Sequence, residues 1–145
     1  MATSNYAGPV DFLVFTFPRG ADLASGLAAL LERVGQGIID ILDLEFVSVA
    51  ADGSAVRLHT VDALAGSGID AELFDGAGSG ILDAADLAAI ATELESDQLA
   101  LAVVYEDRSL AAAADAWSTV GGRELFAGGI DIDDLDRAIN EGITQ

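Results

Sequence analysis

The sequence predicts an α+β fold in which strands and helices alternate along a single domain of 145 residues. Apolar runs with strand character, such as residues 10–17 and 98–105, alternate with segments whose apolar residues recur at helical spacing. Asp52-Gly53 lies between two strand-like segments, and this dipeptide favours a tight antiparallel hairpin. Glycine and proline residues punctuate the segments, so each one is short enough to be a single element.

The first half of the chain predicts, in order, a strand, a helix and a two-stranded hairpin, over residues 10–17, 23–34, 38–49 and 55–61. Asp22 precedes the helical spacing and can cap it. In the second strand Leu42, Leu44 and Phe46 share one face, because side chains alternate along a strand. The hairpin follows from Asp52-Gly53.

The second half predicts a glycine-rich link, a helix, a strand and a final helix-strand-helix unit, over residues 63–80, 83–95, 98–105, 110–117, 123–127 and 131–139. Asp83 and Asp131 are placed to cap the helices that follow them. Trp117 lies on the apolar stripe of its helix, so we expect it in the core.

The element order β-α-β-β-α-β predicts a ferredoxin-like sandwich, an antiparallel sheet with both helices on one face. Residues 1–7 form a tail, 8–105 the core and 106–145 a C-terminal α-β-α extension that adds a fifth strand at a sheet edge. In this arrangement the strand Ile38–Val49 lies at an edge unless the fifth strand pairs with it. The strand Val10–Phe17 carries Phe12 on one face and Phe15 and Phe17 on the other. Both of its faces therefore need cover, from the extra helices or from another chain.

Several segments resemble one family, and they are listed here in chain order: Gly8–Val14, Ile39–Val47 with the following Asp52-Gly53, Leu82–Leu87, Gln98–Glu106 and Gly121–Leu125. They resemble a small actinobacterial family of domains of unknown function, which is similar to a wider bacterial and archaeal family of uncharacterised, sometimes membrane-associated proteins. The resemblance covers about residues 8–139 and implies the fold. It brings no catalytic residues, and the acids Asp70, Glu72 and Asp75 argue against a membrane hairpin in the link.

Charge excludes several classes of function. The chain has 25 acidic residues against six arginines, a net charge of -19, with no lysine, no cysteine and one histidine. Such a surface repels phosphate backbones and anionic lipids, so we expect no nucleic-acid partner and no membrane insertion. The missing thiol and amine remove most routes to covalent catalysis, and we predict a protein that is not an enzyme and needs no cofactor.

The origin of the acidity stays open between a GC-rich genome, a salt-adapted cytoplasm and a surface that binds or steers cations. Two acidic clusters are weak candidates for a metal site. Asp75, Asp83 and Asp86 fall in a stretch with the length of a calcium loop, but Ala77 stands where the third-position ligand belongs. Asp133 and Asp136 lie one helical turn apart. Linker and helix-capping roles explain both clusters more simply.

The function predicted from the sequence is self-association: a cytoplasmic, structural homo-oligomer or polymer whose partner is itself. The alternative is a regulatory module that binds a small ligand or divalent cation weakly through the link 66–86. We expect the interface on the outward face of the second strand, at Asp43, Glu45 and Val47, where an open edge also leaves backbone groups to pair. The terminal unit Arg123–Ile139 is the other candidate.

Overall fold

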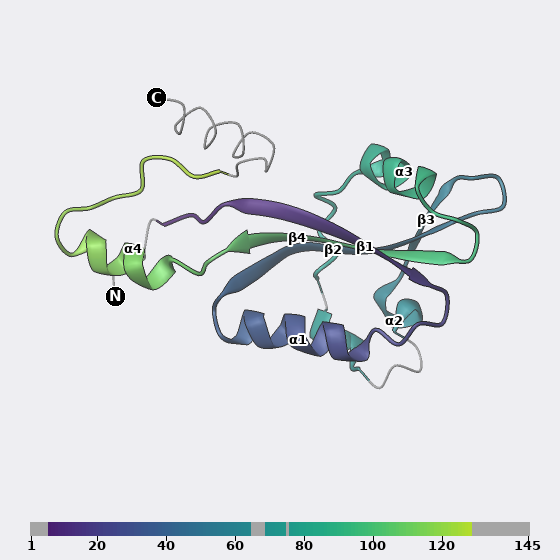
Figure 1. The fold of residues 1–145 in the computed structure, drawn as a ribbon, viewed down its shortest axis with the longest axis horizontal. Helices are drawn as coiled ribbons and strands as arrows, with labels where there is room; N and C mark the ends of the chain where they lie inside the picture. Colours follow the sequence, from purple (N-terminus) through teal and green to yellow (C-terminus); the bar gives the residue numbers. More distant parts are fainter. Residues whose placement is uncertain (1–5, 65–68, 75, 129–145) are drawn as a thin grey trace, which may run out of the picture.

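The computed structural model describes residues 6–64, 69–74 and 76–128 and contains a mixed α+β fold, as predicted. Its elements are the strands β1 (Val10–Pro18), β2 (Ile39–Val49), β3 (Ala55–Leu58) and β4 (Gln98–Asp107), the helices α1 (Ala24–Gly35), α2 (Thr60–Ala63), α3 (Ala84–Thr92) and α4 (Ala111–Ser118), and the 3-10 helix η1 (Ala71–Phe74). The strands form one antiparallel sheet in the order β1-β4-β2-β3 (Figure 1).

The predicted hairpin is confirmed, but its second strand, expected over 55–61, ends at Leu58, and Thr60–Ala63 form the helix α2 instead. β2 and β3 pair antiparallel from Phe46 opposite Leu58 to Val49 opposite Ala55. Gly53 has a φ of 86°, a left-handed conformation that glycine adopts without a steric penalty. Asp52 Oδ1 accepts hydrogen bonds from the Ser54 N–H and hydroxyl at 2.9 and 2.6 Å, which fixes the turn.

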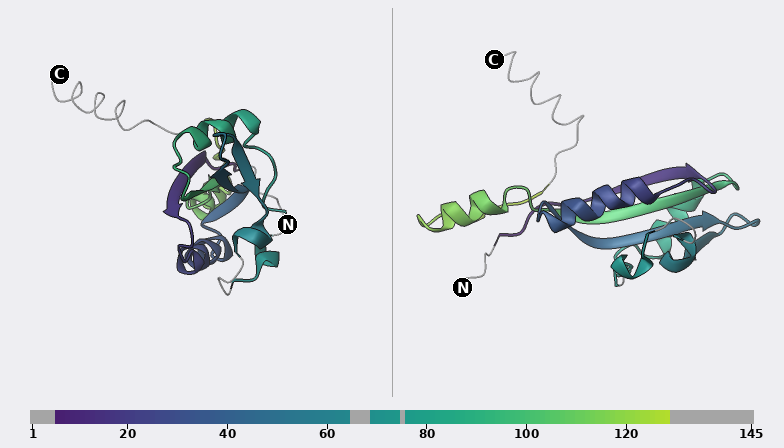
Figure 2. Two further views of the ribbon diagram at one scale, coloured as in Figure 1. Left: turned by 90° about the vertical axis from the view of Figure 1, so that its right-hand side faces the viewer. Right: turned by 90° about the horizontal axis from the view of Figure 1, so that it is seen from below.

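The prediction that both helices share one face is wrong. α1 and α3 lie on opposite sides of the sheet (Figures 1 and 2). Under α1, a buried cluster gathers Leu27, Leu44, Phe46, Leu101 and Val103 with neighbouring residues, and under α3 a smaller one joins Val47, Leu87, Leu94 and Ala100. The reason lies in β4, whose successive residues are apolar, so that both of its faces require cover.

The expected edge position of the second strand is also wrong. β2 lies between β4 and β3, inside the sheet, and a register irregularity separates Ile41 from Asp43. The two edges of the sheet are β1 and β3. β4 pairs with the side of β2 that would have no partner in the expected ferredoxin-like order.

The C-terminal unit differs from its prediction in one respect. α4 forms as expected, but residues 122–128 are in no strand, so the predicted fifth strand is wrong. α4 lies beyond the end of the sheet rather than on either face, and the chain after it turns back toward the start of β1 (Figures 1 and 2). There Glu124 Oε1 accepts a hydrogen bond from the Ala7 N–H at 3.3 Å. The helix expected over 131–139 lies outside the described residues.

Candidate functional site

The strand β1 is a long, open edge of the sheet. Its nine residues pair with β4 on one side, from Val10 opposite Glu106 to Pro18 opposite Gln98. Among the residues that the structure describes, no strand pairs with its other side. Backbone N–H and C=O groups along this edge are therefore available to another chain.

Both faces of β1 are apolar and exposed, as the sequence indicated. Phe12, Val10 and Val14 on the α3 side of the sheet are 67%, 56% and 37% exposed, and Leu13 and Phe15 on the α1 side are each 48% exposed. Within Val10–Pro18 only Asp11 carries a charge. Natural proteins usually protect such an edge with charges, bulges or covering elements, and β1 has little of this protection.

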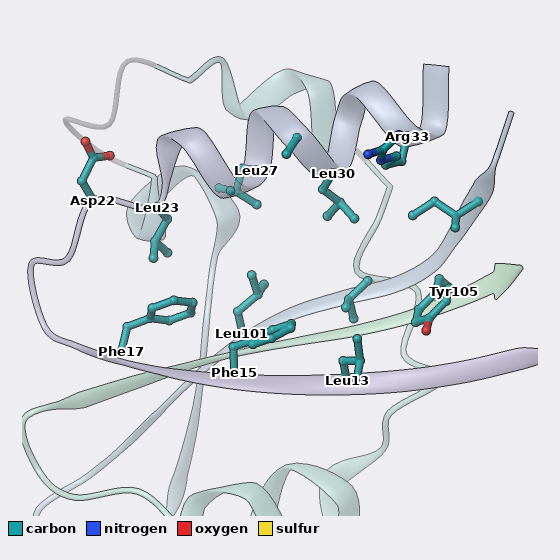
Figure 3. Close-up of a pocket in the computed structure, with 14 residues that line it drawn as sticks. Leu13, Phe15, Phe17, Asp22, Leu23, Leu27, Leu30, Arg33, Leu101 and Tyr105 are labelled. Carbon is teal, nitrogen blue, oxygen red and sulfur yellow. The ribbon is translucent and has the colours of Figure 1, made fainter. Parts of the chain in front are cut away.

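A groove separates α1 from β1 and β4 on one face of the sheet (Figure 3). It has a volume of about 480 Å³ and is lined mainly by leucine and phenylalanine side chains. Leu27 and Leu30 of α1 point across it toward Phe15 and Leu101 of the sheet. α1 therefore covers β2 and β4 without closing over β1.

The C-terminal unit presents a second apolar surface. Its large apolar residues are 59–89% exposed, and they are Leu110, Trp117, Val120, Leu125 and Phe126. The prediction that Trp117 lies in the core is wrong, because Trp117 is 62% exposed and α4 lies beyond the end of the sheet (Figures 1 and 2). Both β1 and this unit thus expose several large apolar side chains close together, a feature typical of surfaces that contact another molecule.

The residues expected at an interface are buried instead. Asp43, Glu45 and Val47 are 0%, 4% and 0% exposed, so they cannot form an outward contact surface of this fold. They do share one face of β2, but α3 and the loop 76–82 cover that face. Val47 lies on the same face of β2 as Asp43 and Glu45, and its apolar side chain was the sequence feature that indicated a buried face.

Asp43 fastens the loop 76–82 to the sheet. Its Oδ1 accepts a hydrogen bond from the Ser79 N–H at 2.9 Å, and its Oδ2 accepts one from the Leu82 N–H at 2.8 Å. The Leu44 N–H donates to the Ala77 carbonyl at 2.9 Å. The glycine-rich link, predicted as a flexible connection, is therefore ordered over this stretch by a buried carboxylate.

Glu45 forms the second half of a buried acid pair. Its Oε2 lies 3.1 Å from Arg57 Nε, while Oε1 is buried without a hydrogen-bond partner in the described structure. Burial raises the pKa of Glu45, the hydrogen bond to Asp43 and the charge of Asp43 raise it further, and Arg57 opposes the shift. Burial also acts to raise the pKa of Asp43, but hydrogen bonds from Leu82, Glu45 and Ser79 outweigh it and lower that pKa. The pKa of Glu45 therefore lies above its ordinary value and the pKa of Asp43 below its own.

The proposed metal ligands are not brought together. Asp83 and Asp86 form a capping box at the start of α3, in which each side chain accepts the other residue's N–H, at 2.9 and 3.0 Å. Asp75, Asp133 and Asp136 lie outside the described residues. Across residues 6–64, 69–74 and 76–128, no three His, Cys, Asp or Glu side chains gather closely enough to hold a metal ion.

Comparison with known proteins adds no relative: no family model, no curated protein and no solved structure matches this chain. Over the described part of the chain, no helix has both the length and the apolar character needed to cross a membrane. The exposed surface of β1 is therefore the feature of this structure that best supports a proposal on function.

Proposed function

We propose that this protein is a non-enzymatic, self-associating structural protein of the cytoplasm, whose copies join through β1. The observation that carries the proposal is an unpaired nine-residue edge strand with large apolar side chains exposed on both faces. We also retain, as part of the proposal, membership of the family of domains of unknown function that the sequence resembles.

The simplest contact is an isologous pairing of two β1 strands. Antiparallel pairing about a twofold axis joins two four-stranded sheets into one of eight strands and satisfies the open backbone groups. Phe12 and Val14 of one copy then meet the same residues of the other, which removes apolar surface from water. Because Asp11 is the only charge in the strand, the contact buries little charge.

The C-terminal unit supports a second, weaker contact in the same proposal. Trp117 and Phe126 are 62% and 89% exposed, and α4, which carries Trp117, lies beyond the end of the sheet (Figure 1). A contact through this unit, added to a β1 dimer, extends the assembly beyond two copies, which is the polymeric form of the proposal.

A cysteine scan tests the β1 pairing directly, since the chain has no cysteine of its own. We expect one of Phe12→Cys, Val14→Cys and Thr16→Cys, the one nearest the twofold axis, to form a disulfide-linked dimer under mild oxidation. Val56→Cys is the matched control, because Val56 is also 37% exposed and lies on β3, the opposite edge of the sheet. Cross-linking that is equal at Val56 and along β1 contradicts the proposal.

A charge variant tests whether the side chains hold the assembly together. Phe12→Lys places a charge on the apolar face of the contact and lowers the net negative charge, so a loss of association cannot come from stronger overall repulsion between copies. We expect light scattering in 1 M NaCl, where repulsion between copies is screened, to give the mass of a single chain for this variant and a larger mass for the unaltered protein. Leu73→Lys, at a side chain that is 61% exposed in η1, makes the same charge change elsewhere and leaves the assembly intact.

A further inference from the structure

The groove between α1 and the sheet has the properties of a small-molecule site. Its volume of about 480 Å³ lies in the range of ligand pockets, and its walls are apolar. The groove follows α1 from Leu23 to Arg33, a length of roughly 15 Å at the rise of an α-helix. An elongated apolar ligand fits this shape better than a compact one.

The two ends of the groove differ in charge. Arg33 and Tyr105 line one end and Asp22 lies at the other (Figure 3). Arg33 Nη1 donates to Gln36 Oε1 at 3.2 Å, but Arg33 makes no ion pair with any described residue. Arg57 and Arg108 are paired with Glu45 and Glu106, whereas Arg19, Arg33 and Arg123 have no ion pair among the described residues, and of these three only Arg33 lines the groove. In a chain of net charge -19, an arginine left without a carboxylate at the mouth of an apolar groove is an available anion site.

We propose that this groove binds an amphipathic anion, an unbranched acyl chain that ends in a carboxylate. The chain lies between Leu27 of α1 and Phe15 and Leu101 of the sheet, where it loses contact with water. The carboxylate lies at Arg33, and Asp22 repels it from the opposite end, so the ligand has one orientation. This inference goes beyond the proposed self-association, whose contact is made by the backbone edge of β1 and by the opposite face at Phe12, although Leu13 and Phe15 belong to the exposed surface of β1 as well as to the groove.

Calorimetric titration with decanoate, decanol and decylammonium tests the head-group preference at 0.15 M NaCl. The overall charge of the protein favours binding of the ammonium, whereas Arg33 favours binding of the carboxylate. The two effects therefore predict opposite orders of affinity for decanoate and decylammonium. We expect decanoate to bind most tightly, with one molecule per chain, and decylammonium most weakly. Equal affinities for decanoate and decanol, or tightest binding of decylammonium, overturn the proposal.

Two variants locate the ligand. Arg33→Gln is expected to weaken decanoate binding roughly tenfold and to leave decanol unchanged, because only the carboxylate loses a charged hydrogen bond. Gly26→Leu is expected to abolish binding of both, since Gly26 lines the groove and a Cβ built there meets no atom within 4 Å. Ala28→Leu adds the same side chain at an exposed α1 residue outside the groove and should bind normally.

The sizing of the same variants separates this proposal from self-association. Phe12→Lys should bind decanoate as the unaltered protein does, whatever its mass in solution. If Gly26→Leu leaves decanoate binding intact, the ligand lies elsewhere and the proposal fails. If Gly26→Leu changes the mass by light scattering and no ligand binds the unaltered protein, the groove belongs to the contact between copies, and the proposal fails in favour of that occupant.

Discussion

The two buried acids of β2, Asp43 and Glu45, have different structural roles. Asp43 is fully buried, yet both of its oxygens accept backbone hydrogen bonds from the loop 76–82. A buried carboxylate is tolerated when its oxygens are satisfied in this way. Glu45 is less well satisfied, because Arg57 reaches only one of its oxygens. The pair therefore fixes the loop through Asp43 and titrates through Glu45.

Replacement of Glu45 by glutamine should change how stability depends on pH. The pKa of Glu45 is raised in the folded state above its ordinary value of 4.5, so the folded protein holds a proton that the unfolded chain releases. The contribution of Glu45 to stability is complete below pH 4.5 and is lost as the pH rises through the raised pKa. Asp43 has the opposite sign, and its contribution is lost only as the pH falls below its ordinary 3.8.

Glu45→Gln keeps a donor toward Asp43 and removes this titration. We expect the free energy of unfolding in urea to fall less between pH 5 and pH 8 in Glu45→Gln than in the unaltered protein. Glu93→Gln, which neutralises an exposed carboxylate at the end of α3, serves as the control for the change in net charge. Identical slopes in Glu45→Gln and the unaltered protein would show that Glu45 does not carry a shifted proton.

At the scale of elements, the turn and helix-cap signals of the sequence predicted the structure correctly, whereas the predicted arrangement of the strands was wrong. Asp52-Gly53 predicted the hairpin correctly because a turn with a left-handed glycine depends on only two or three neighbouring residues. Asp83 predicted the start of α3 correctly because a helix cap is equally local. The placement of β4 between β1 and β2 depends on packing between segments some 60–90 residues apart. Hydrophobic periodicity describes only neighbouring residues and cannot predict such packing. The strand predicted over 123–127 is wrong, since residues 122–128 pair with no strand although the edge strand β1 starts close to Glu124.

Two glycine substitutions test the roles assigned to the turn and to the end of α1. Gly53→Ala should lower the free energy of unfolding by about 1–2 kcal/mol, because alanine is strained in the left-handed conformation. Gly35→Ala should raise it by about 0.4–1 kcal/mol, since Gly35 is helical and a Cβ built there meets no atom within 4 Å. Urea unfolding of both variants measures the two effects. The same sign for both would contradict the backbone assignment at one of the two sites.

At the scale of the whole molecule, two features oppose each other. The net charge of -19 keeps copies apart, while the apolar surfaces of β1 and the C-terminal unit favour contact. The sequence revealed both the charge and the two-faced strand, since composition and alternation are local properties. It did not reveal the groove, because Arg33 and Tyr105 come together only when α1 is laid across β4. It also predicted exposed contact residues on β2 that are buried, because the position of β2 inside the sheet depends on the strand order.

The balance between these two features predicts how salt acts on the assembly. The screening length falls from about 30 Å at 0.01 M salt to about 3 Å at 1 M, so added NaCl weakens the repulsion between copies but leaves apolar contacts in place. We expect light scattering to show the 14.8 kDa chain at low salt and at least twice that mass in 1 M NaCl, with a higher melting temperature. Phe12→Lys should stay at the mass of one chain in both conditions while its melting temperature still rises, because repulsion within each copy is screened as well. An assembly that dissociates as NaCl is added would instead be held by ion pairs, and β1 would not be its contact.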